Sequence, residues 1–297
     1  GATTLNVLHC PSMSRTSQSL PLNNDPRTIV ITGASDGVGA AAARILHQRR
    51  PQDSLVIVGR NPEKTQAVAE EIGADFHVAD YESLGQVRQL AEELRQYPQI
   101  DALGNNAGGM FDGPFATADG FERTWQINVV APFLLTSLLR DTLRASDATV
   151  VQTSSLANVL YSAFDPGDPN TFEKFSAERA YGNAKLGDIL LTRYLDSHGL
   201  TSVAFHPGIL NTGFGHNSTS RTSKLYSTAA AQYVLGKADK GGENLAYFLS
   251  GTPGIHFESG EYYNQKRKPG LQRPIAKKLS VARRIFDDLG RQLNVEW

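Results

Sequence analysis

The sequence contains little cysteine, little net charge and no pattern typical of a metal site. Cys10 is the only cysteine among 297 residues, which excludes an intrachain disulfide and a thiolate metal cluster and predicts a reducing, cytoplasmic setting. The 29 basic and 30 acidic residues nearly cancel, so the charge excess of a nucleic-acid-binding protein is missing. For His206 and His216, a satisfied or solvated imidazole is favoured over a metal ligand.

The sequence also lacks an apolar run long enough to cross a membrane. Its longest run, INVVAPFLLTSLL at 127–139, is shorter than the ~20 residues that span a bilayer and is interrupted by Asn128 and Pro132. This run predicts a buried helix. Residues 1–26 are rich in Ser, Thr, Asn and Pro and lack the basic and apolar segments of a secretory signal, so we expect a flexible N-terminal tail.

What the sequence does contain is a regular alternation of apolar strands and helices. A β-branched run starts at Thr28, turns through glycines and continues into an alanine-rich helix. Asn61, Pro62 and Gly73 are expected to cap, open and end the second helix. The other predicted strands are 54–60, 74–80, 100–108, 148–155 and 201–208, and the other predicted helices are 61–73, 82–97, 121–143 and a helix through the 180s and 190s.

This alternation determines the expected fold. Near-continuous apolar strands joined by helical crossovers favour a parallel sheet that is covered on both faces. We therefore predict an α/β fold with a single doubly wound, Rossmann-type parallel sheet and helices on both faces. The expected domain spans residues 27–265, with a C-terminal helical extension at 266–297, and no repeat or linker divides the core.

The first strand and helix are joined by a glycine-rich turn, TGASDGVG at 32–39. Gly33 permits the tight turn, Gly37 allows the backbone to approach a ligand, and Gly39 allows close packing of the helix. Backbone N–H groups and the helix dipole then face an anion. The turn predicts a site for the pyrophosphate of a dinucleotide, and a purely structural turn is the alternative.

A second motif is AYGNAKLG at 180–187, in which Tyr181 precedes Lys185 by four positions. This spacing makes the two side chains neighbours on one helix face, so that both could act on the same small molecule. Taken alone, the pair is equally typical of a half-buried tyrosine beside a solvated lysine.

Taken together, these motifs resemble the short-chain dehydrogenase/reductase family. The glycine spacing G-x-x-x-G-x-G resembles the family's cofactor motif, and further motifs follow in the family's order over about residues 28–265: NNAG at 105–108, Asn128, Ser155, the pair Tyr181 and Lys185, and HPG at 206–208. The chain is most similar to the retinol dehydrogenase and protochlorophyllide reductase-like branch. The long interval between Ser155 and Tyr181, the HPGILNT segment and the stretch from GENLAYFLSG to ARRIFDDLG carry that likeness.

The resemblance implies a nicotinamide dinucleotide as cofactor. Arg60 follows the second strand, and a guanidinium suits a 2′-phosphate, so NADP(H) is preferred, while Asp36 keeps NAD(H) possible. Arg60 could instead be a solvated surface arginine, Asp80 could bind the adenine amino group or cap the next helix, and Thr212 could cap a short helix. The implied cofactor-binding residues are Gly33, Ser35, Asp36, Gly37, Val38, Gly39, Arg60, Asp80, Asn106, Ala107, Gly108, Tyr181, Lys185, Pro207, Gly208 and Thr212.

The resemblance also implies catalytic roles for Asn128, Ser155, Tyr181 and Lys185. Tyr181 would donate its proton to a carbonyl oxygen that Ser155 holds. Lys185 would lower the tyrosine pKa from its ordinary value near ~10 and hold the nicotinamide ribose. Asn128 would fix a water that connects Lys185 to solvent, or it could be a polar interruption bonded within its helix. Ser154 is adjacent, and Ser155 is chosen because the family's serine is usually the second of such a pair.

The substrate is expected between residues 156–164 and the segment 213–227, which is rich in Gly and Ser and could form a mobile lid. Apolar side chains in the first stretch predict a hydrophobic ketone or aldehyde, unless they pack that stretch onto the sheet: Val159, Leu160, Tyr161 and Phe164. The basic residues within 266–284 are typical of a solvated face, and an acidic substrate or a membrane-surface contact is less favoured.

The expected activity is therefore an NADP(H)-dependent carbonyl reductase that works in reverse as an alcohol dehydrogenase. The alternative is a non-catalytic NADP(H)-binding sensor or interaction module. We expect a small-molecule substrate and no membrane span, and the choice between monomer and homo-oligomer stays open.

Overall fold

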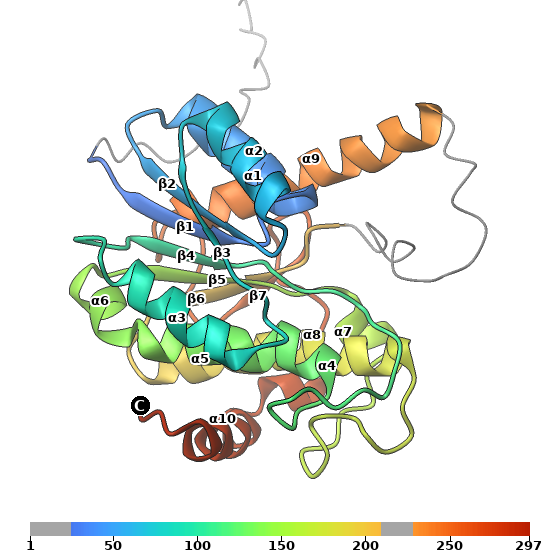
Figure 1. Ribbon diagram of the computed structural model, residues 1–297. Coiled ribbons are helices and arrows are strands. Elements are labelled where there is room, and N and C mark those ends of the chain that lie inside the picture. Colours follow the sequence, from blue (N-terminus) through green and yellow to red (C-terminus); the bar gives the residue numbers. More distant parts are fainter. Residues whose placement is uncertain (1–24, 209–227) are drawn as a thin grey trace, which may run out of the picture.

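The computed structural model describes residues 25–208 and 228–297 and contains one seven-stranded parallel sheet (Figure 1). The strands lie in the order β3-β2-β1-β4-β5-β6-β7, which reverses between β1 and β4. In the register, Ile31 of β1 pairs with Ile57 of β2 on one side and with Gly104 of β4 on the other. The strands are β1 Thr28–Thr32, β2 Ser54–Gly59, β3 Asp75–Val78, β4 Ala102–Asn105, β5 Thr149–Thr153, β6 Ser202–Phe205 and β7 Tyr262–Tyr263.

Helices cover both faces of this sheet, so the predicted doubly wound fold is confirmed (Figure 1). One face is covered by α1 Gly37–Arg49, α2 Pro62–Ile72 and α9 Thr228–Ser250, and the other by α3 Leu84–Leu94, α5 Ala131–Leu138, α6 Arg140–Ala145 and α8 Ala177–Ser197. The 3-10 turn η2 Pro274–Lys277 and helix α10 Leu279–Leu293 pack on the outside of α8.

Local sequence signals set the ends of helix α2 as expected. The Asn61 side chain accepts a hydrogen bond from the Lys64 N–H at 2.9 Å, and Pro62 occupies the first helical position, where it has no intrahelical N–H bond to lose. Gly73 ends the helix in the left-handed conformation at φ 63°.

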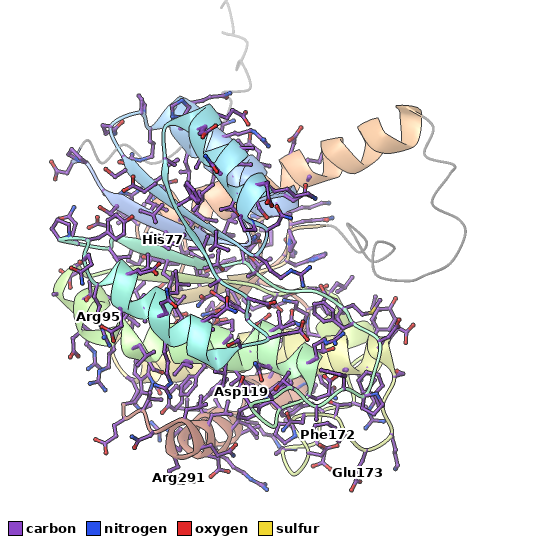
Figure 2. All side chains as sticks on the ribbon, viewed as in Figure 1. His77, Arg95, Asp119, Phe172, Glu173 and Arg291 are labelled. Carbon is purple, nitrogen blue, oxygen red and sulfur yellow. The ribbon has the colours of Figure 1, made fainter. Side chains whose placement is uncertain are left out.

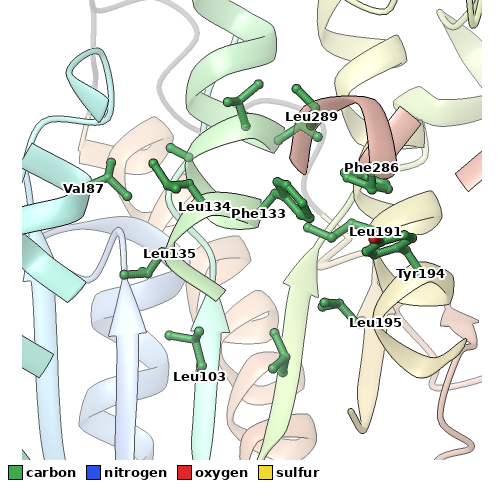
Figure 3. Packing of buried hydrophobic residues seen from close by; sticks show 14 of the residues in the cluster. Val87, Leu103, Phe133, Leu134, Leu135, Leu191, Tyr194, Leu195, Phe286 and Leu289 are labelled. Carbon is green, nitrogen blue, oxygen red and sulfur yellow. The ribbon is translucent and has the colours of Figure 1, made fainter. Parts of the chain in front are cut away.

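The hydrophobic core consists of two clusters, one on each face of the sheet. In the cluster under α5 and α8, the Phe133 and Phe286 rings lie 5.2 Å apart and the Tyr194 and Phe286 rings 5.3 Å apart (Figure 3). Each large side chain buried in this way contributes about 1.5–3 kcal/mol. Helix α10 is therefore attached to α8 by core packing as well as by the chain.

The prediction of one continuous helix over 121–143 is wrong. The segment divides into α4 Arg123–Trp125, the π-helical turn η1 Gln126–Val130, α5 and α6. The Ala131 N–H bonds to the Gln126 carbonyl five residues earlier, and the Asn128 side chain occupies the Thr124 carbonyl. A side chain that competes for a backbone acceptor widens the helix at this turn.

The edge strand β3 is largely exposed; its backbone pairs with β2, and its side chain His77 adds polar contacts. His77 Nδ1 lies 2.7 Å from Glu93 Oε2, and its Nε2 lies 3.0 Å from the Tyr97 hydroxyl. Figure 2 labels His77. Phe172 and Glu173 lie at the outer edge of the long loop that precedes α8 (Figure 2).

None of the helices among the described residues is both long enough and apolar enough to span a bilayer.

Candidate active site

The glycine turn lies at the carboxyl end of β1, where the strand order reverses. Gly33 has φ 63°, and a Cβ there would approach the Ala107 backbone to 2.8 Å. A Cβ on Gly39 would lie 2.3 Å from the Gly33 carbonyl oxygen, so glycine is required for α1 to pack this close. Gly37 has φ 54° and faces open space, with Asp36 capping its N–H at 2.8 Å and Val38 half-buried beside it.

Asn106 connects three segments at this edge of the sheet. Its Nδ2 donates to the carbonyls of Thr32 and Gly33 at 3.1 and 3.2 Å, and its Oδ1 accepts from the Thr153 hydroxyl at 3.1 Å. Ala107 N–H donates to the Thr32 hydroxyl at 3.1 Å. Asn106 is one of the predicted cofactor-binding residues, and its polar side-chain atoms hold the glycine turn to β4 and β5.

A cavity of about 260 Å³ opens beside the turn at the carboxyl ends of β1 to β4. It brings together several of the predicted cofactor residues from different strands: Gly33, Ser35, Arg60, Asp80, Ala107 and Gly108. The remaining lining residues are Thr32, Val58, Gly59, Ala79, Tyr81, Gly109, Met110, Phe111 and Ile127. Polar groups near β2 and β3 and apolar groups near β4 suit an adenosine moiety.

The charged residues around this cavity differ in their exposure and in their hydrogen-bond and ion-pair partners. Arg60 is exposed at the rim, and no carboxylate among residues 25–208 and 228–297 forms an ion pair with it. Asp36 points outward and lies 3.6 Å from Lys64 Nζ, so its charge is partly balanced. Asp80 accepts a hydrogen bond from the Glu82 N–H, whereas Ser83 caps α3. The capping alternative for Asp80 is therefore wrong.

Helix α8 carries Tyr181 and Lys185 on the face that meets the sheet. Lys185 is 5% exposed, and its Nζ lies 5.5 Å from the centre of the Tyr181 ring. Nζ donates to the Thr153 carbonyl and to Asp188 Oδ2, each at 2.9 Å. Because the lysine is buried and the tyrosine only partly exposed, the alternative of a solvated lysine does not hold.

The two neighbouring serines have different partners. Ser154 Oγ donates to the Lys185 carbonyl at 2.7 Å and fastens β5 to α8. Ser155 Oγ accepts from the Ala157 N–H at 3.1 Å and is hydrogen-bonded to the Tyr181 side chain. It is Ser155 that adjoins the phenol.

Asn128 lies in the π-helical turn and is bonded to backbone on both sides. Its Nδ2 donates to the carbonyls of Thr124 and Gly109 at 2.7 and 2.8 Å, and its Oδ1 accepts from the Gly109 N–H at 3.1 Å. A Cβ on Gly108 would lie 2.3 Å from Asn128 Oδ1 and 3.4 Å from Lys185 Nζ. Asn128 thus holds the loop after β4 close to the Lys185 ammonium.

Burial dominates the electrostatics of Tyr181. Burial raises its pKa, the nearby Lys185 charge lowers it, and burial prevails, so the net direction is opposite to the expected lowering. Burial also disfavours the charged form of Lys185, but the charge of Asp188 and the contact with Tyr181 raise its pKa above the usual value. The site therefore combines a protonated phenol with an ammonium at neutral pH.

Three residues of this site escaped sequence reasoning. Asp188 pairs with Lys185 three positions earlier, a spacing that is equally common between exposed helix residues. Gly182 allows the short helix α7 Ala157–Leu160 to touch α8, because a Cβ there would lie 2.7 Å from the Ser162 nitrogen. Asn158 is fully buried, and its Nδ2 donates to the Ser155 carbonyl at 2.7 Å.

The residues predicted to surround the substrate fall into two groups. Phe164 packs against Trp125 with ring centres 6.0 Å apart, so it belongs to the packing of the insertion. Leu160 and Tyr161 are 52% and 47% exposed at the end of α7, and Val159 is half-buried. The segment 213–227 lies outside the described residues.

The HPG motif follows β6 beside the same edge of the sheet. His206 is buried, its Nδ1 accepts from the Gly208 N–H at 3.4 Å, and burial lowers its pKa to about 4, so the imidazole is neutral. Pro207 is buried, and Gly208 has φ 85°. Thr212 and His216 lie outside the described residues.

Comparison with known proteins gives the class of the chain. The profile of the family described as short chain dehydrogenase matches residues 27–223, and the chain belongs to this family of oxidoreductases. The motif order, the parallel sheet and the retinol dehydrogenases among its relatives place it in the retinol dehydrogenase-like branch. The family binds a nicotinamide dinucleotide.

Two curated relatives and one solved structure illustrate the match. The chain is 35% identical over 263 residues to "Putative daunorubicin C-13 ketoreductase DnrU" of Streptomyces sp. (strain C5), which covers 84% of this chain and 87% of that protein. It is 30% identical over 286 residues to retinol dehydrogenase 13 of Homo sapiens, covering 91% and 85% of the two chains. A crystal structure of an uncharacterized protein from Mycobacterium paratuberculosis superposes with a TM-score of 0.70 at 25% identity, covering 91% and 94%.

Proposed function

We propose that the protein transfers a hydride between NADP(H) and a carbonyl or alcohol, with a hydrophobic ketone or aldehyde as substrate. The observation that carries this proposal is the convergence of Ser155, Tyr181 and Lys185, with Lys185 next to Gly108, which lines the cavity beside the glycine turn. A nucleotide sensor would need the turn and the cavity but no buried pair of phenol and ammonium. The enzyme is therefore the better supported reading.

The residues of the site divide the proton chemistry among them. The nicotinamide, when bound, supplies or accepts the hydride. Tyr181 donates its hydroxyl proton to the carbonyl oxygen, and the Ser155 hydroxyl holds that oxygen by a hydrogen bond. Lys185 stabilises the phenolate that remains, and Asn128 holds the backbone of Gly109, whose neighbour Gly108 lies beside Lys185. In the reverse direction Tyr181 accepts the proton of an alcohol.

The cavity and the turn fit a dinucleotide. Gly37 exposes backbone at the first turn of α1, where a helix N-terminus stabilises a pyrophosphate. Apart from its two neighbours and the backbone of its own helix, no atom of the described residues lies within 4 Å of the position of its absent Cβ. Arg60 would pair with the 2′-phosphate, and Asp80 would accept from the adenine amino group. The Lys185 ammonium has three N–H groups, of which two donate to protein oxygens, so the third is available to a ribose hydroxyl.

The apolar side chains at the end of α7 support a hydrophobic substrate. Leu160 and Tyr161 are exposed a few residues after Ser155, where they would cover an apolar group attached to the reacting carbonyl. The printed names of the relatives, a C-13 ketoreductase and retinol dehydrogenases, agree with bulky ketones and alcohols as substrate classes. A panel of aromatic and alicyclic ketones should show loss of NADPH absorbance. Tight NADPH binding without turnover on any of them would favour the sensor instead.

Cofactor preference should depend on Arg60. We expect Arg60→Asp to lower the ratio of kcat/KM for NADPH to that for NADH by at least about tenfold. A hydrogen bond to a charged group contributes about 1.5–3 kcal/mol, and 1.4 kcal/mol corresponds to a factor of ten. Arg284→Asp makes the same change of charge at an exposed position of α10 and should leave the ratio unchanged. An unaltered ratio in Arg60→Asp would mean that another residue binds the 2′-phosphate.

A further inference from the structure

The buried carboxylate of Asp188 forms an ion pair with Lys185. Asp188 Oδ2 lies 2.9 Å from Lys185 Nζ, and the two side chains are 3% and 6% exposed. Both residues belong to α8, three positions apart, and the Thr153 carbonyl of β5 is the other acceptor for Nζ. A buried ion pair of this kind seldom stabilises a fold more than apolar residues would, so its presence calls for another reason.

The first effect of Asp188 is on Lys185. Burial alone would favour a neutral amine, and the carboxylate reverses that preference and raises the pKa of Lys185. Burial raises the pKa of Asp188 to about 6 against the opposing effect of Lys185, so the carboxylate is ionised at neutral pH. Because two of the three Nζ hydrogens point at fixed acceptors, the ammonium is also held in one orientation.

The second effect is on Tyr181. The negative charge of Asp188 raises the pKa of the phenol and so works against Lys185. The uncharged groups facing the three side chains are the Thr153 carbonyl of β5, the Ser155 hydroxyl and the buried Tyr262 phenol of β7. Within the described part of the chain, no other ionised group contributes to the pKa values of Tyr181, Lys185 and Asp188.

We propose that Asp188 is a positioning residue that holds the Lys185 ammonium charged and oriented and keeps the Tyr181 phenol protonated, so that carbonyl reduction extends to higher pH and alcohol oxidation begins only at higher pH. This inference rests on the proposed function. The ion pair acts on the pH range of each direction of the reaction and leaves the equilibrium between them unchanged. A protonated phenol is the form that donates to a carbonyl oxygen, whereas oxidation requires the phenolate.

The test compares pH profiles of kcat/KM for wild type and Asp188→Asn, for ketone reduction with NADPH and for oxidation of the product alcohol with NADP⁺. Loss of the carboxylate lowers the pKa of both Tyr181 and Lys185. The expected shift of the pH profile is therefore the same whether its apparent pKa belongs to the tyrosine or to the lysine. We expect the alkaline limb of reduction and the acid limb of oxidation both to move to lower pH by about one unit or more. Limbs that stay at the wild-type pH would overturn the proposal.

Three further variants separate this role from a structural one. Asp188→Glu restores the carboxylate and should return the limbs toward the wild-type pH. Asp188→Ser, also uncharged, takes the place of the asparagine variant if that variant does not fold, with the same expected shift. Asp53→Asn breaks another buried i,i+3 pair, with Arg50, and should lower Tm without moving either limb. Absence of turnover in the wild type would refute the proposed function itself, whereas turnover with unmoved limbs would refute only the role of Asp188.

Discussion

Phenylalanine at position 181 should lower kcat for ketone reduction at least about a hundredfold while the Kd for NADPH stays nearly unchanged. General acid catalysis by a positioned side chain contributes about 10²–10⁴ in rate, and the substitution removes only the hydroxyl that carries the proton. The ring can remain where it packs beside Lys185. Steady-state kinetics and a fluorescence titration with NADPH measure the two quantities separately.

A tyrosine on the other face of the sheet provides the matched control. Tyr247 of α9 donates its hydroxyl to the His256 carbonyl at 3.1 Å, so Tyr247→Phe also removes one phenolic hydrogen bond. This variant should turn over at the wild-type rate. If Tyr181→Phe lost only a few-fold in kcat, the acid would have to be another group, and Ser155 would be the first to test.

Alanine in place of Gly182 should reduce kcat/KM by about 10- to 100-fold and destabilise the fold by about 1–3 kcal/mol. The added methyl would lie 2.7 Å from the Ser162 nitrogen and 2.8 Å from the Ala157 carbonyl oxygen, so α7 must move away from α8. Ser155 caps the Ala157 N–H and would move with it. A displacement of about 1 Å at a positioning group is enough for this loss of rate.

The appropriate control is another helical glycine with room for a methyl group. Gly85 is exposed on α3, and a Cβ there would come no closer than 3.6 Å to Ser83 Oγ. Gly85→Ala should raise stability by up to about 1 kcal/mol through helix propensity and leave kcat/KM unchanged. Thermal unfolding and steady-state kinetics on both variants give the comparison. Destabilised Gly182→Ala with undiminished kcat/KM would show that α7 does not position Ser155.

Much of the fold could be predicted because its signals are local. Apolar runs at 28–32 and 54–59 and the cap at Asn61 act within a few residues, and the strands and helix appear where these signals lie. The two-residue strand β7 has no periodicity of its own and exists because Tyr262 and Tyr263 pair with β6. At the break in the helix, the Asn128 side chain bonds both to the Thr124 carbonyl and to Gly109, which lies 19 residues away in the sequence, and the sequence does not show this second contact.

The residues of the site could be predicted from sequence motifs, but their protonation states and pKa shifts could not. Ser155, Tyr181 and Lys185 follow from spacing and resemblance, and the structure brings them together. The sequence gives no measure of burial, and burial decides that the pKa of Tyr181 is raised. For the same reason Asp188 looks like one more charged helix residue until its side chain is found 3% exposed against Lys185.

The strand order reverses between β1 and β4, so β2 and β3 lie on one side of this point and β5 and β6 on the other. In the proposed function, nucleotide recognition would draw on the ends of β2 and β3 and proton transfer on β5 and α8. Among the described residues, Arg60 and Asp188 have no bonding partner in common. Substitutions on opposite sides should then multiply in their effects on rate. An engineer could thus retune the cofactor and the operating pH of this scaffold one at a time.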